Sequence, residues 1–426
     1  MSDEKIGNRN LVILGALIVQ LCLGSIYAWS FFQAALNGGI PPVGAYQWPS
    51  FFSQLPFAAG LASFALFMIF AGRWQDRVGP RKVATVGGVL LGIGYISAFF
   101  VDMVAGGDAL IGTIYLIITY GIIGGAGIGF AYVCPIAALV KWFPDKKGTI
   151  TGIAVAGFGA GALVFGYVEQ FLLTLYNVPT TINIGMPMLI LGVVYLVLVV
   201  LGAQLLTNPP EGWLPAGYTP PQTTADGAGT GMMPGEMIRT STFWLLWVMF
   251  VLAATAGLMT LGNVKSAALA IDATADAVIV VGVMSLLNAA GRIVWGAVSD
   301  KLGRESTMIL MFLTLAIGMF IFAWMSTIAI SWLAVMAIAS LIGFCFGGNF
   351  ALFPSATADF FGSKNVGKNY GVMFTAYGIA GITGALVAGP IVDFFGSYYW
   401  AFIITGILAI VAVMITFVLK SKRKNA

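Results

Sequence analysis

Long apolar segments separated by short polar ones make up most of the 426-residue chain. Each of them holds about 20 mostly apolar residues, the length that an α-helix needs to cross roughly 30 Å of hydrocarbon. This pattern predicts an all-α membrane protein. The twelve predicted membrane-spanning helices cover residues 11–33, 50–71, 84–103, 110–139, 149–173, 183–206, 243–267, 276–297, 307–325, 329–354, 369–390 and 399–419.

The basic residues sort to one side of this arrangement. Of the 20 Lys and Arg residues, 18 lie in the two terminal segments or in the connections that follow the even-numbered spans. The carboxylates of Asp102, Asp108, Asp272 and Asp276 lie on the other side, and Asp393 lies near it. Because cytoplasmic loops carry the excess of Lys and Arg, we expect both termini in the cytoplasm and the protein in the plasma membrane, the inner membrane of the cell.

The chain is expected to consist of two six-helix halves. Residues 207–242 are the main polar interruption, and they form a linker between a first bundle, 1–206, and a second bundle, 243–426. A Gly-x-x-x-Asp-basic-x-Gly loop follows span two, at Asp76, and recurs after span eight, at Asp300. Such repeats are typical of secondary transporters, whose substrate site lies near the middle of the membrane between the halves.

The composition argues against several other kinds of site. Only 8% of the residues are charged, 59% are hydrophobic, and there is no histidine. The cysteines Cys22, Cys134 and Cys345 lie inside apolar segments without a metal-binding spacing. The glycine run 124–129 lies within a span and lacks the lysine and helix start of a nucleotide-binding loop. We therefore expect no cofactor, no metal and no enzymatic activity.

The repeated loop resembles the signature loop of the major facilitator superfamily. In that family the charged residues of the loop join the ends of neighbouring helices and do not bind substrate. The resemblance therefore implies two pseudo-symmetric six-helix bundles of the major facilitator fold. It also implies a gating role for Asp76, Arg77, Asp300 and Lys301. For one copy alone, a charged cytoplasmic turn would be the simpler interpretation.

A closer resemblance runs through nearly the whole chain. Its most distinctive stretches are Lys-Trp-Phe-Pro-Asp-Lys-Lys-Gly at 141–148, Ile-Arg-Thr-Ser-Thr-Phe-Trp at 238–244, Ala-Leu-Phe-Pro-Ser at 351–355 and Lys-Asn-Tyr-Gly at 368–371. Together they resemble the oxalate:formate antiporter family, which is akin to the monocarboxylate transporters. The resemblance implies a carrier of small carboxylates.

Two basic residues, Lys265 and Arg292, fall inside predicted spans. Lys265 is near the outer end of span seven, and we interpret it as a lysine whose ammonium reaches the membrane interface. Arg292 is inside span eight, where a charge costs on the order of 2.5–3.5 kcal/mol and is normally paired or functional. The sixteen acidic residues fall in loops or near span ends, with Glu169 and Asp393 as the least clear cases.

Arg292 is therefore a candidate for binding a substrate anion, because its planar fork matches a carboxylate bidentately. A structural arginine that bonds helix carbonyls or reaches the cytoplasm is the alternative. The resemblance supports the first interpretation, since this position matches the substrate-binding arginine of the family. Asn288 precedes Arg292 by four residues and shares its helical face, so it can orient the guanidinium or bond the substrate.

The resemblance extends the site to further positions of the family's pocket. It implies a small aromatic chamber with a few hydroxyl and amide donors, made of Tyr27, Gln54, Tyr132, Phe158, Phe346 and Phe350. Taken alone, any one of these aromatic residues is more often a packing or lipid-facing residue.

Tyr377 is the main departure from the family pattern. The oxalate-transporting members that this stretch resembles carry a lysine there, and a second cation can neutralise a dianion. With Arg292 alone, a dianion would keep an unpaired charge in a cavity of low dielectric constant, which costs several kcal/mol. The sequence therefore favours a monocarboxylate such as lactate, pyruvate, formate or acetate over oxalate.

We expect a secondary transporter that moves a small carboxylate across the lipid bilayer by alternating access. Anion exchange is favoured because the empty carrier leaves Arg292 uncompensated, and proton symport is the alternative coupling. An oxalate:formate antiporter, with Lys265 as its second cation, is the alternative function. A membrane sensor and an exporter of cationic drugs are more distant alternatives. We expect a functional monomer without a nucleic-acid partner.

Overall fold

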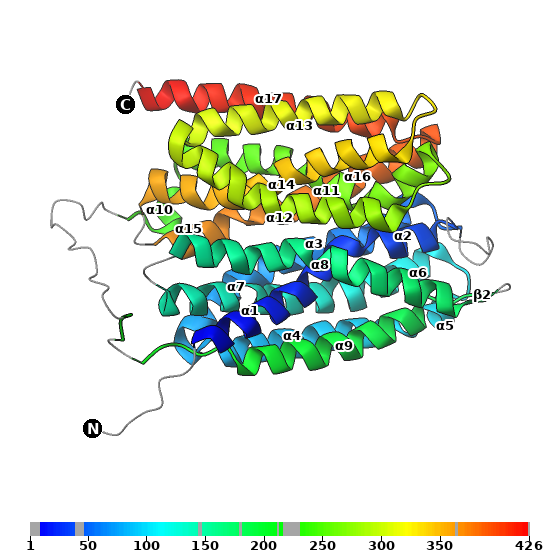
Figure 1. Ribbon diagram of the computed structural model, residues 1–426, viewed down its shortest axis with the longest axis horizontal. Coiled ribbons are helices and arrows are strands. Elements are labelled where there is room, and N and C mark those ends of the chain that lie inside the picture. Colours follow the sequence, from blue (N-terminus) through cyan, green and yellow to red (C-terminus); the bar gives the residue numbers. More distant parts are fainter. Residues whose placement is uncertain are drawn as a thin grey trace.

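The computed structural model describes residues 9–38, 47–143, 147–178, 181–210, 213–215, 231–362 and 365–424, which are mostly helical (Figure 1). The first half, with a 3₁₀ segment η1 and a π-helical segment η2, contains α1 (Arg9–Leu23), η1 (Gly24–Ala28), α2 (Ser30–Leu36), α3 (Ser50–Val78), α4 (Pro80–Ala98), α5 (Val101–Ala105), α6 (Ala109–Leu116), η2 (Ile117–Gly124), α7 (Gly125–Trp142), α8 (Lys147–Tyr176) and α9 (Gly185–Gln204). The second half contains α11 (Ser241–Ile271), α12 (Ala277–Leu302), α13 (Arg304–Met325), α14 (Trp332–Phe361), α15 (Val366–Met373), α16 (Thr375–Phe395) and α17 (Tyr399–Lys424).

Eleven helical segments of the described ranges are long and apolar enough to cross a membrane. They coincide with the predicted spans except the third, 84–103. The corresponding helix, α4, has 19 residues and begins with Arg81 and Lys82 in its first turn, so its apolar stretch is short. It packs between α9 and α7 like the other helices of its bundle.

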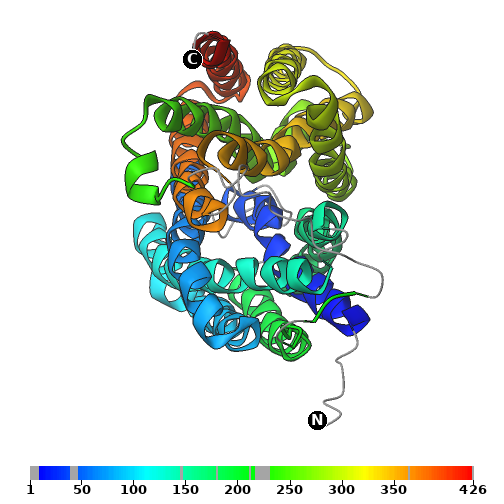
Figure 2. The same cartoon turned by 90° about the vertical axis from the view of Figure 1, so that its left-hand side faces the viewer.

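The helices form two bundles, which are stacked one above the other in Figure 1 and seen along the helix axes in Figure 2. The bundles meet mainly where α3 packs on α16, α8 on α12, and α2 on α11. The start of α1 and the end of α17 lie on the same side of the molecule, at the left of Figure 1. We call this the terminal side, and the other the opposite side.

One element on the opposite side was not predicted. Strands β1 (Asn177–Val178) and β2 (Thr181–Ile182) pair as an antiparallel hairpin between α8 and α9. The hairpin lies in the connection between the predicted fifth and sixth spans, so the predicted all-α bundles are unaffected by it. Strands of two residues are too short to show a pattern of alternating apolar positions.

Three of the predicted spans are not continuous α-helices. The first contains the 3₁₀ segment η1, the fourth contains the π-helical segment η2, and the eleventh is broken between α15 and α16. The first break, η1, lies where the chain comes very close to α8. A Cβ atom on Gly24 would stand 1.9 Å from the carbonyl oxygen of Phe158 on α8. Irregular helical segments of this kind are frequent at functional sites.

The described parts of the predicted linker 207–242 are attached to both bundles. At its start, the indole N–H of Trp142 donates to the carbonyl of Thr207 at 2.7 Å, and the Trp142 ring packs edge-on against Trp213. At its end, the short helix α10 (Pro234–Met237) precedes α11, and the amide of Asn369 donates to the carbonyl of Met232 at 3.0 Å. Residues 211–212 and 216–230 lie outside the described ranges.

Candidate substrate-binding site

Arg292 lies within α12, on the face that packs against α8 of the other bundle. Its side chain is only 5% exposed. Nε and Nη2 donate to Oδ1 of Asn288 at 3.3 and 3.1 Å, and Nη1 donates to the backbone carbonyl of Val155 on α8 at 3.0 Å. Both acceptors are neutral, and the described residues include no acidic side chain that forms an ion pair with Arg292. The guanidinium is therefore an uncompensated positive charge inside the protein.

The bonds of Arg292 to Asn288 and Val155 use only part of its guanidinium. An arginine carries one N–H on Nε and two on each Nη, and the three described bonds use one from each nitrogen. One N–H on Nη1 and one on Nη2 remain, and the further hydrogen-bond partners of the guanidinium are the neutral hydroxyls of Tyr27 and Tyr132. A carboxylate can accept such a pair of N–H groups bidentately.

Asn288 holds the guanidinium in this orientation. Its amide Nδ2 donates to the carbonyl of Gly343 on α14 at 3.2 Å, which directs Oδ1 toward Arg292. The two helices are in close contact here, because a Cβ atom on Gly347 would stand 2.0 Å from the carbonyl oxygen of Asn288. Only glycine permits this approach of α14 to α12.

Aromatic rings surround the arginine. The guanidinium carbon lies 4.3 Å from the ring centroid of Phe350 and 5.8 Å from that of Phe158. Phe350 contacts Phe346 edge-on at 5.3 Å, and Phe158 contacts Tyr132 edge-on at 5.1 Å. The faces of these rings attract the cation without neutralising it, so they stabilise Arg292 and leave it available for an anion.

Tyr27 and Tyr377 close the site from the two halves. Tyr27 lies in η1 and Tyr377 in α16, and their hydroxyl oxygens are 3.0 Å apart. The Tyr27 ring also contacts Phe158 edge-on at 5.2 Å. Both tyrosines are buried and interact electrostatically with Arg292. The conformation is thus closed around the arginine, with side chains of both bundles in the enclosing wall.

Gln54 is the one predicted pocket residue that the structure places in a different contact network. Its amide nitrogen donates to the carbonyl of Gly262 at 3.2 Å and to Oδ1 of Asn263 at 2.9 Å, both on α11. These bonds connect the two halves nearer the opposite side. The structure therefore assigns Gln54 to the closure between α3 and α11, away from the ring cluster around Arg292.

Two aromatic residues of the cluster were not identified from the sequence. Phe374, at the break between α15 and α16, stacks on Tyr377 at 4.8 Å, and Phe64 on α3 lies 5.8 Å from the same ring. The sequence spacing of both residues could have indicated that they belong to the cluster. Phe374 precedes Tyr377 by three residues, and Phe64 follows Gln54 and Phe57 at spacings that keep all three on one face of α3.

Comparison with known proteins identifies the family. A family model described as the Major Facilitator Superfamily matches residues 11–377 and 279–426. The chain belongs to the major facilitator superfamily. An inward-open structure of the xylose transporter XylE from Escherichia coli aligns over 96% of both chains with a TM-score of 0.71 at 15% identity. The predicted major facilitator fold is thereby confirmed.

Two relatives bear on the closer resemblance. The oxalate:formate antiporter of Oxalobacter formigenes is 29% identical over 423 residues, covering 98% of this chain and 93% of the antiporter. The apicoplast pyruvate carrier 1 of Toxoplasma gondii is 28% identical over 452 residues, covering 85% of this chain and 80% of the carrier. The predicted resemblance to the oxalate:formate antiporter family is confirmed.

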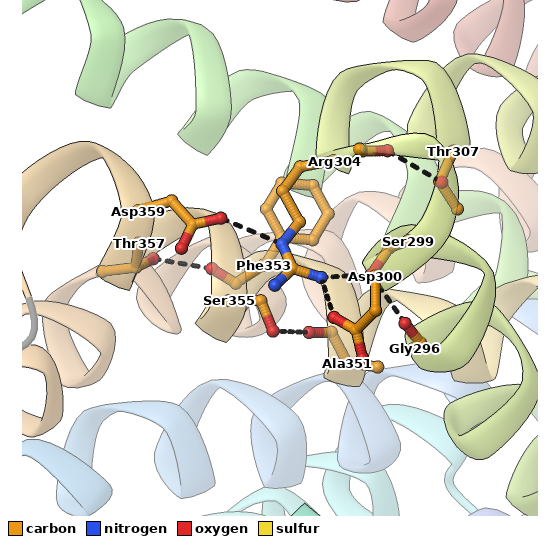
Figure 3. A network of polar contacts seen from close by, with 11 residues as sticks. Gly296, Ser299, Asp300, Arg304, Thr307, Ala351, Phe353, Ser355, Thr357 and Asp359 are labelled. Carbon is orange, nitrogen blue, oxygen red and sulfur yellow. Dashed lines mark hydrogen bonds and ion pairs between the residues drawn. The ribbon is translucent and has the colours of Figure 1, made fainter. Parts of the chain in front are cut away.

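The second copy of the superfamily's signature loop forms a polar network on the terminal side (Figure 3). Arg304 donates from Nη1 to Asp300 at 2.8 Å and from Nε to Asp359 on α14 at 3.0 Å, and Nη1 also contacts the Ser299 hydroxyl. Arg304 thus joins the start of α13 to the ends of α12 and α14. It was missed as a network member, although it follows Asp300 by four residues, the spacing of helical ion pairs.

The structure also describes the side chains of two other predicted gating residues. Lys301 and Arg77 are exposed. The side chain of Asp76 lies outside the described part of the structure. The network in the described residues is therefore that of the second half.

The interpretation of Lys265 as an interfacial lysine is wrong. Its side chain is 3% exposed, its ammonium donates to Oε1 of Gln170 at 2.6 Å, and it lies 4.4 Å from the ring centroid of Phe31. The neighbouring Glu169 is also buried, at 1% exposed. Both lie several residues inside their helices, α11 and α8, where a position alone does not show whether a side chain faces lipid or protein.

Proposed function

We propose that this protein is a secondary transporter of small monocarboxylate anions. The observation that carries the proposal is the buried guanidinium of Arg292, whose described partners, including the hydroxyls of Tyr27 and Tyr132, are all neutral. A bound monocarboxylate would compensate the charge that the protein leaves unpaired. Such pairing recovers part of the several kcal/mol that a buried charge costs.

The preference for a monoanion rests on the surroundings of Arg292. Tyr377, which is neutral, lies in the enclosing wall, and its hydroxyl faces Tyr27. Lys265 is too far away to serve as a second cation. Lys265 and Arg292 contact α8 at Gln170 and Val155, which are 15 residues apart (170 − 155), or roughly 22 Å at 1.5 Å per residue. A small dicarboxylate does not span that distance.

The relatives support a carboxylate as the substrate class. One of them is named an oxalate:formate antiporter and another a pyruvate carrier, so both names refer to small carboxylates. Oxalate:formate exchange is the second candidate function, favoured by the coverage of the antiporter over nearly the whole chain. It would require a dianion to bind with one arginine as its only nearby cation.

The site suits alternating access between the two bundles. Its wall combines Tyr27, Phe158 and Tyr132 of the first half with Arg292 and Tyr377 of the second, so a relative rotation of the halves opens it to one side at a time. By the distribution of basic residues, the terminal side is cytoplasmic in this proposal. The carrier acts as a monomer in the plasma membrane and couples transport to anion exchange or to proton symport.

Counterflow in proteoliposomes tests the proposal. Vesicles are loaded with unlabelled pyruvate, and labelled pyruvate, lactate, formate, acetate or oxalate is added outside. We expect uptake of the monocarboxylates that internal pyruvate stimulates, and little uptake of oxalate. Arg292→Ala should reduce uptake by about 100-fold, since two charge-assisted hydrogen bonds together contribute about 3 kcal/mol.

A matched control separates the site from charge in general. Arg239 is exposed beside α10, and Arg239→Ala should transport normally. Oxalate uptake as fast as pyruvate uptake would favour the antiporter function. Uptake that persists in Arg292→Ala would show that Arg292 is not the substrate-binding residue.

A further inference from the structure

Glu169 is a buried acid that the proposed transport site does not use. It lies on α8, seven residues before the helix ends at Tyr176, and its side chain is 1% exposed. Neither carboxyl oxygen has a hydrogen-bond partner among the described residues. An ionised carboxylate in such a place costs several kcal/mol, because no donor replaces the water that it loses.

The surroundings of Glu169 are polar on one side. Three tyrosines interact with it electrostatically, Tyr95 on α4, Tyr120 in η2 and Tyr195 on α9. The hydroxyls of Tyr120 and Tyr195 are themselves buried, and they interact with the side chains of Tyr95 and Ser25. The inner part of the first bundle therefore contains a group of buried hydroxyls around a single carboxyl group.

Lys265 is the one cation that acts on this carboxyl group in the described part of the chain. It belongs to α11 of the second half, whereas Glu169 belongs to the first. Its ammonium bonds to the amide of Gln170 and lies over the face of Phe31, and it makes no ion pair with Glu169. An ionised Glu169 would attract the ammonium into a direct pair. The observed arrangement, with the ammonium on the adjacent neutral amide, is the one that a protonated carboxyl group permits.

We infer that Glu169 is a proton-binding residue, and that the proton it carries is the ion coupled to movement of the substrate. This inference rests on the proposed function only for the identity of the co-transported anion. One proton moving with one monocarboxylate transfers no net charge. With this inference, the coupling is proton symport and not anion exchange.

Proton binding at Glu169 changes the attraction between the two halves. When the carboxyl group is protonated, Lys265 bonds to neutral partners on α8 and α2, as in the described conformation. When the proton leaves, the carboxylate and the ammonium attract each other across the boundary between the bundles. Ionisation therefore favours closure of α8 against α11 on the opposite side, and protonation weakens that closure.

The proton site is separate from the anion site. Glu169 lies next to Gln170, roughly 20 Å along α8 from Val155, which bonds to Arg292. A proton on Glu169 therefore does not compete with a carboxylate on Arg292 for the same atoms. Glu169 and Arg292 each interact with the other half of the protein. Proton binding and anion binding are therefore coupled through the relative position of the two halves.

The first experiment measures protons and anion together in proteoliposomes that contain a trapped pH-sensitive dye. We expect pyruvate added outside to acidify the lumen of vesicles with the wild-type protein, and an inward proton gradient to accumulate pyruvate. Glu169→Gln should abolish both effects and retain pyruvate counterflow between compartments of equal pH. Glu236→Gln is the matched control, since Glu236 is exposed at α10 and its oxygen accepts the Met233 N–H, which an amide can also do.

The second measurement does not depend on transport. Infrared spectra of the purified protein in lipid should show a protonated-carboxyl band at neutral pH that is lost in Glu169→Gln and kept in Glu236→Gln. Absence of this band, proton coupling that survives in Glu169→Gln, or accumulation driven by sodium instead of protons would overturn the inference. If no carboxylate shows counterflow while the band is present and Glu169-dependent, the proposed substrate fails and the proton site stands.

Discussion

The carboxylate of Asp393 accepts a hydrogen bond of 2.6 Å from the backbone N–H of Ser50, although the two residues belong to different halves of the protein. Its second oxygen accepts from the backbone N–H of Phe51 at 2.9 Å. These are the free N–H groups of the first turn of α3, so a carboxylate at the end of α16 caps a helix of the other bundle. The contact lies on the opposite side and joins the two halves there.

Asp393→Ala should open the opposite side more often. Loss of two charge-assisted bonds to a helix start weakens the closed arrangement by about 1–2 kcal/mol, which is a change of roughly 5–30-fold in the ratio of open to closed molecules. The measurement is the rate at which a membrane-impermeant maleimide labels Ala34→Cys, a buried position on α2, in a background without the native cysteines.

The control for this prediction is Asp276→Ala. Asp276 also caps a helix on the same side, but its partner is Ile279 of its own helix, so no contact between the halves is lost. Its labelling rate should equal that of the parent. Equal rates for Asp393→Ala and Asp276→Ala would mean that the cap does not contribute to closure.

The sequence predicts the helices and Arg292 because both depend on local composition. About 20 consecutive apolar residues place a helix across a membrane regardless of what it packs against, and an arginine within such a run is unusual by itself. The orienting role of Asn288 follows in the same way from a spacing of four residues on one helix. Each of these inferences uses contacts within a single element.

The surroundings of Lys265, Glu169 and Gln54 depend on contacts between elements. Lys265 lies six residues from the end of α11, a distance over which a lysine on the lipid face would reach the interface, yet it points toward α8 of the other half. Glu169 is hidden in the same way inside the first bundle. Gln54 is polar and correctly located on α3, but which of two polar networks it joins is decided by the packing of α11.

Asn288→Asp should inhibit transport more than Asn288→Ala. The aspartate would place a permanent anion against Arg292 and satisfy the charge that the substrate otherwise satisfies, so pyruvate would have to displace an internal ion pair. We expect a rise in the apparent KM of at least about tenfold, against about two- to fivefold for the alanine variant, which only loosens the guanidinium. Concentration series of pyruvate counterflow distinguish the two, and equal KM values would argue against direct contact between substrate and Arg292.

We expect Asp272 to make a pH-dependent contribution to the stability of the folded protein. It follows α11 and accepts hydrogen bonds from the side chain and backbone of Thr274 and from the backbone N–H of Trp332 at the start of α14. These bonds hold the pKa of the Asp272 carboxyl group below its ordinary value. A carboxyl group whose pKa is lower in the folded state stabilises the fold above its unfolded pKa and loses that effect as the pH falls through the folded value.

Asp272→Asn should therefore lower the thermal midpoint of the detergent-solubilised protein at pH 7, and the difference from wild type should shrink as the pH falls below about 4. Asp108→Asn provides a comparison on the same side, because Asp108 caps only its own helix α6 through Leu110 and Ile111. A difference for Asp272→Asn that stays constant down to the lowest pH would show that its carboxylate charge does not matter.

Tyr377→Lys tests whether the number of cations sets the charge of the substrate. Tyr377 and Arg292 belong to the same ring cluster, so a lysine at position 377 adds a second positive charge beside the anion. A dianion then gains an ion pair in a low-dielectric site, and we expect the ratio of oxalate to pyruvate uptake to rise at least about tenfold. Tyr377→Phe, which removes the hydroxyl contact with Tyr27 and adds no charge, should leave the ratio unchanged. A similar rise in both variants would attribute selectivity to the tyrosine pair, because the added charge would then have no effect of its own.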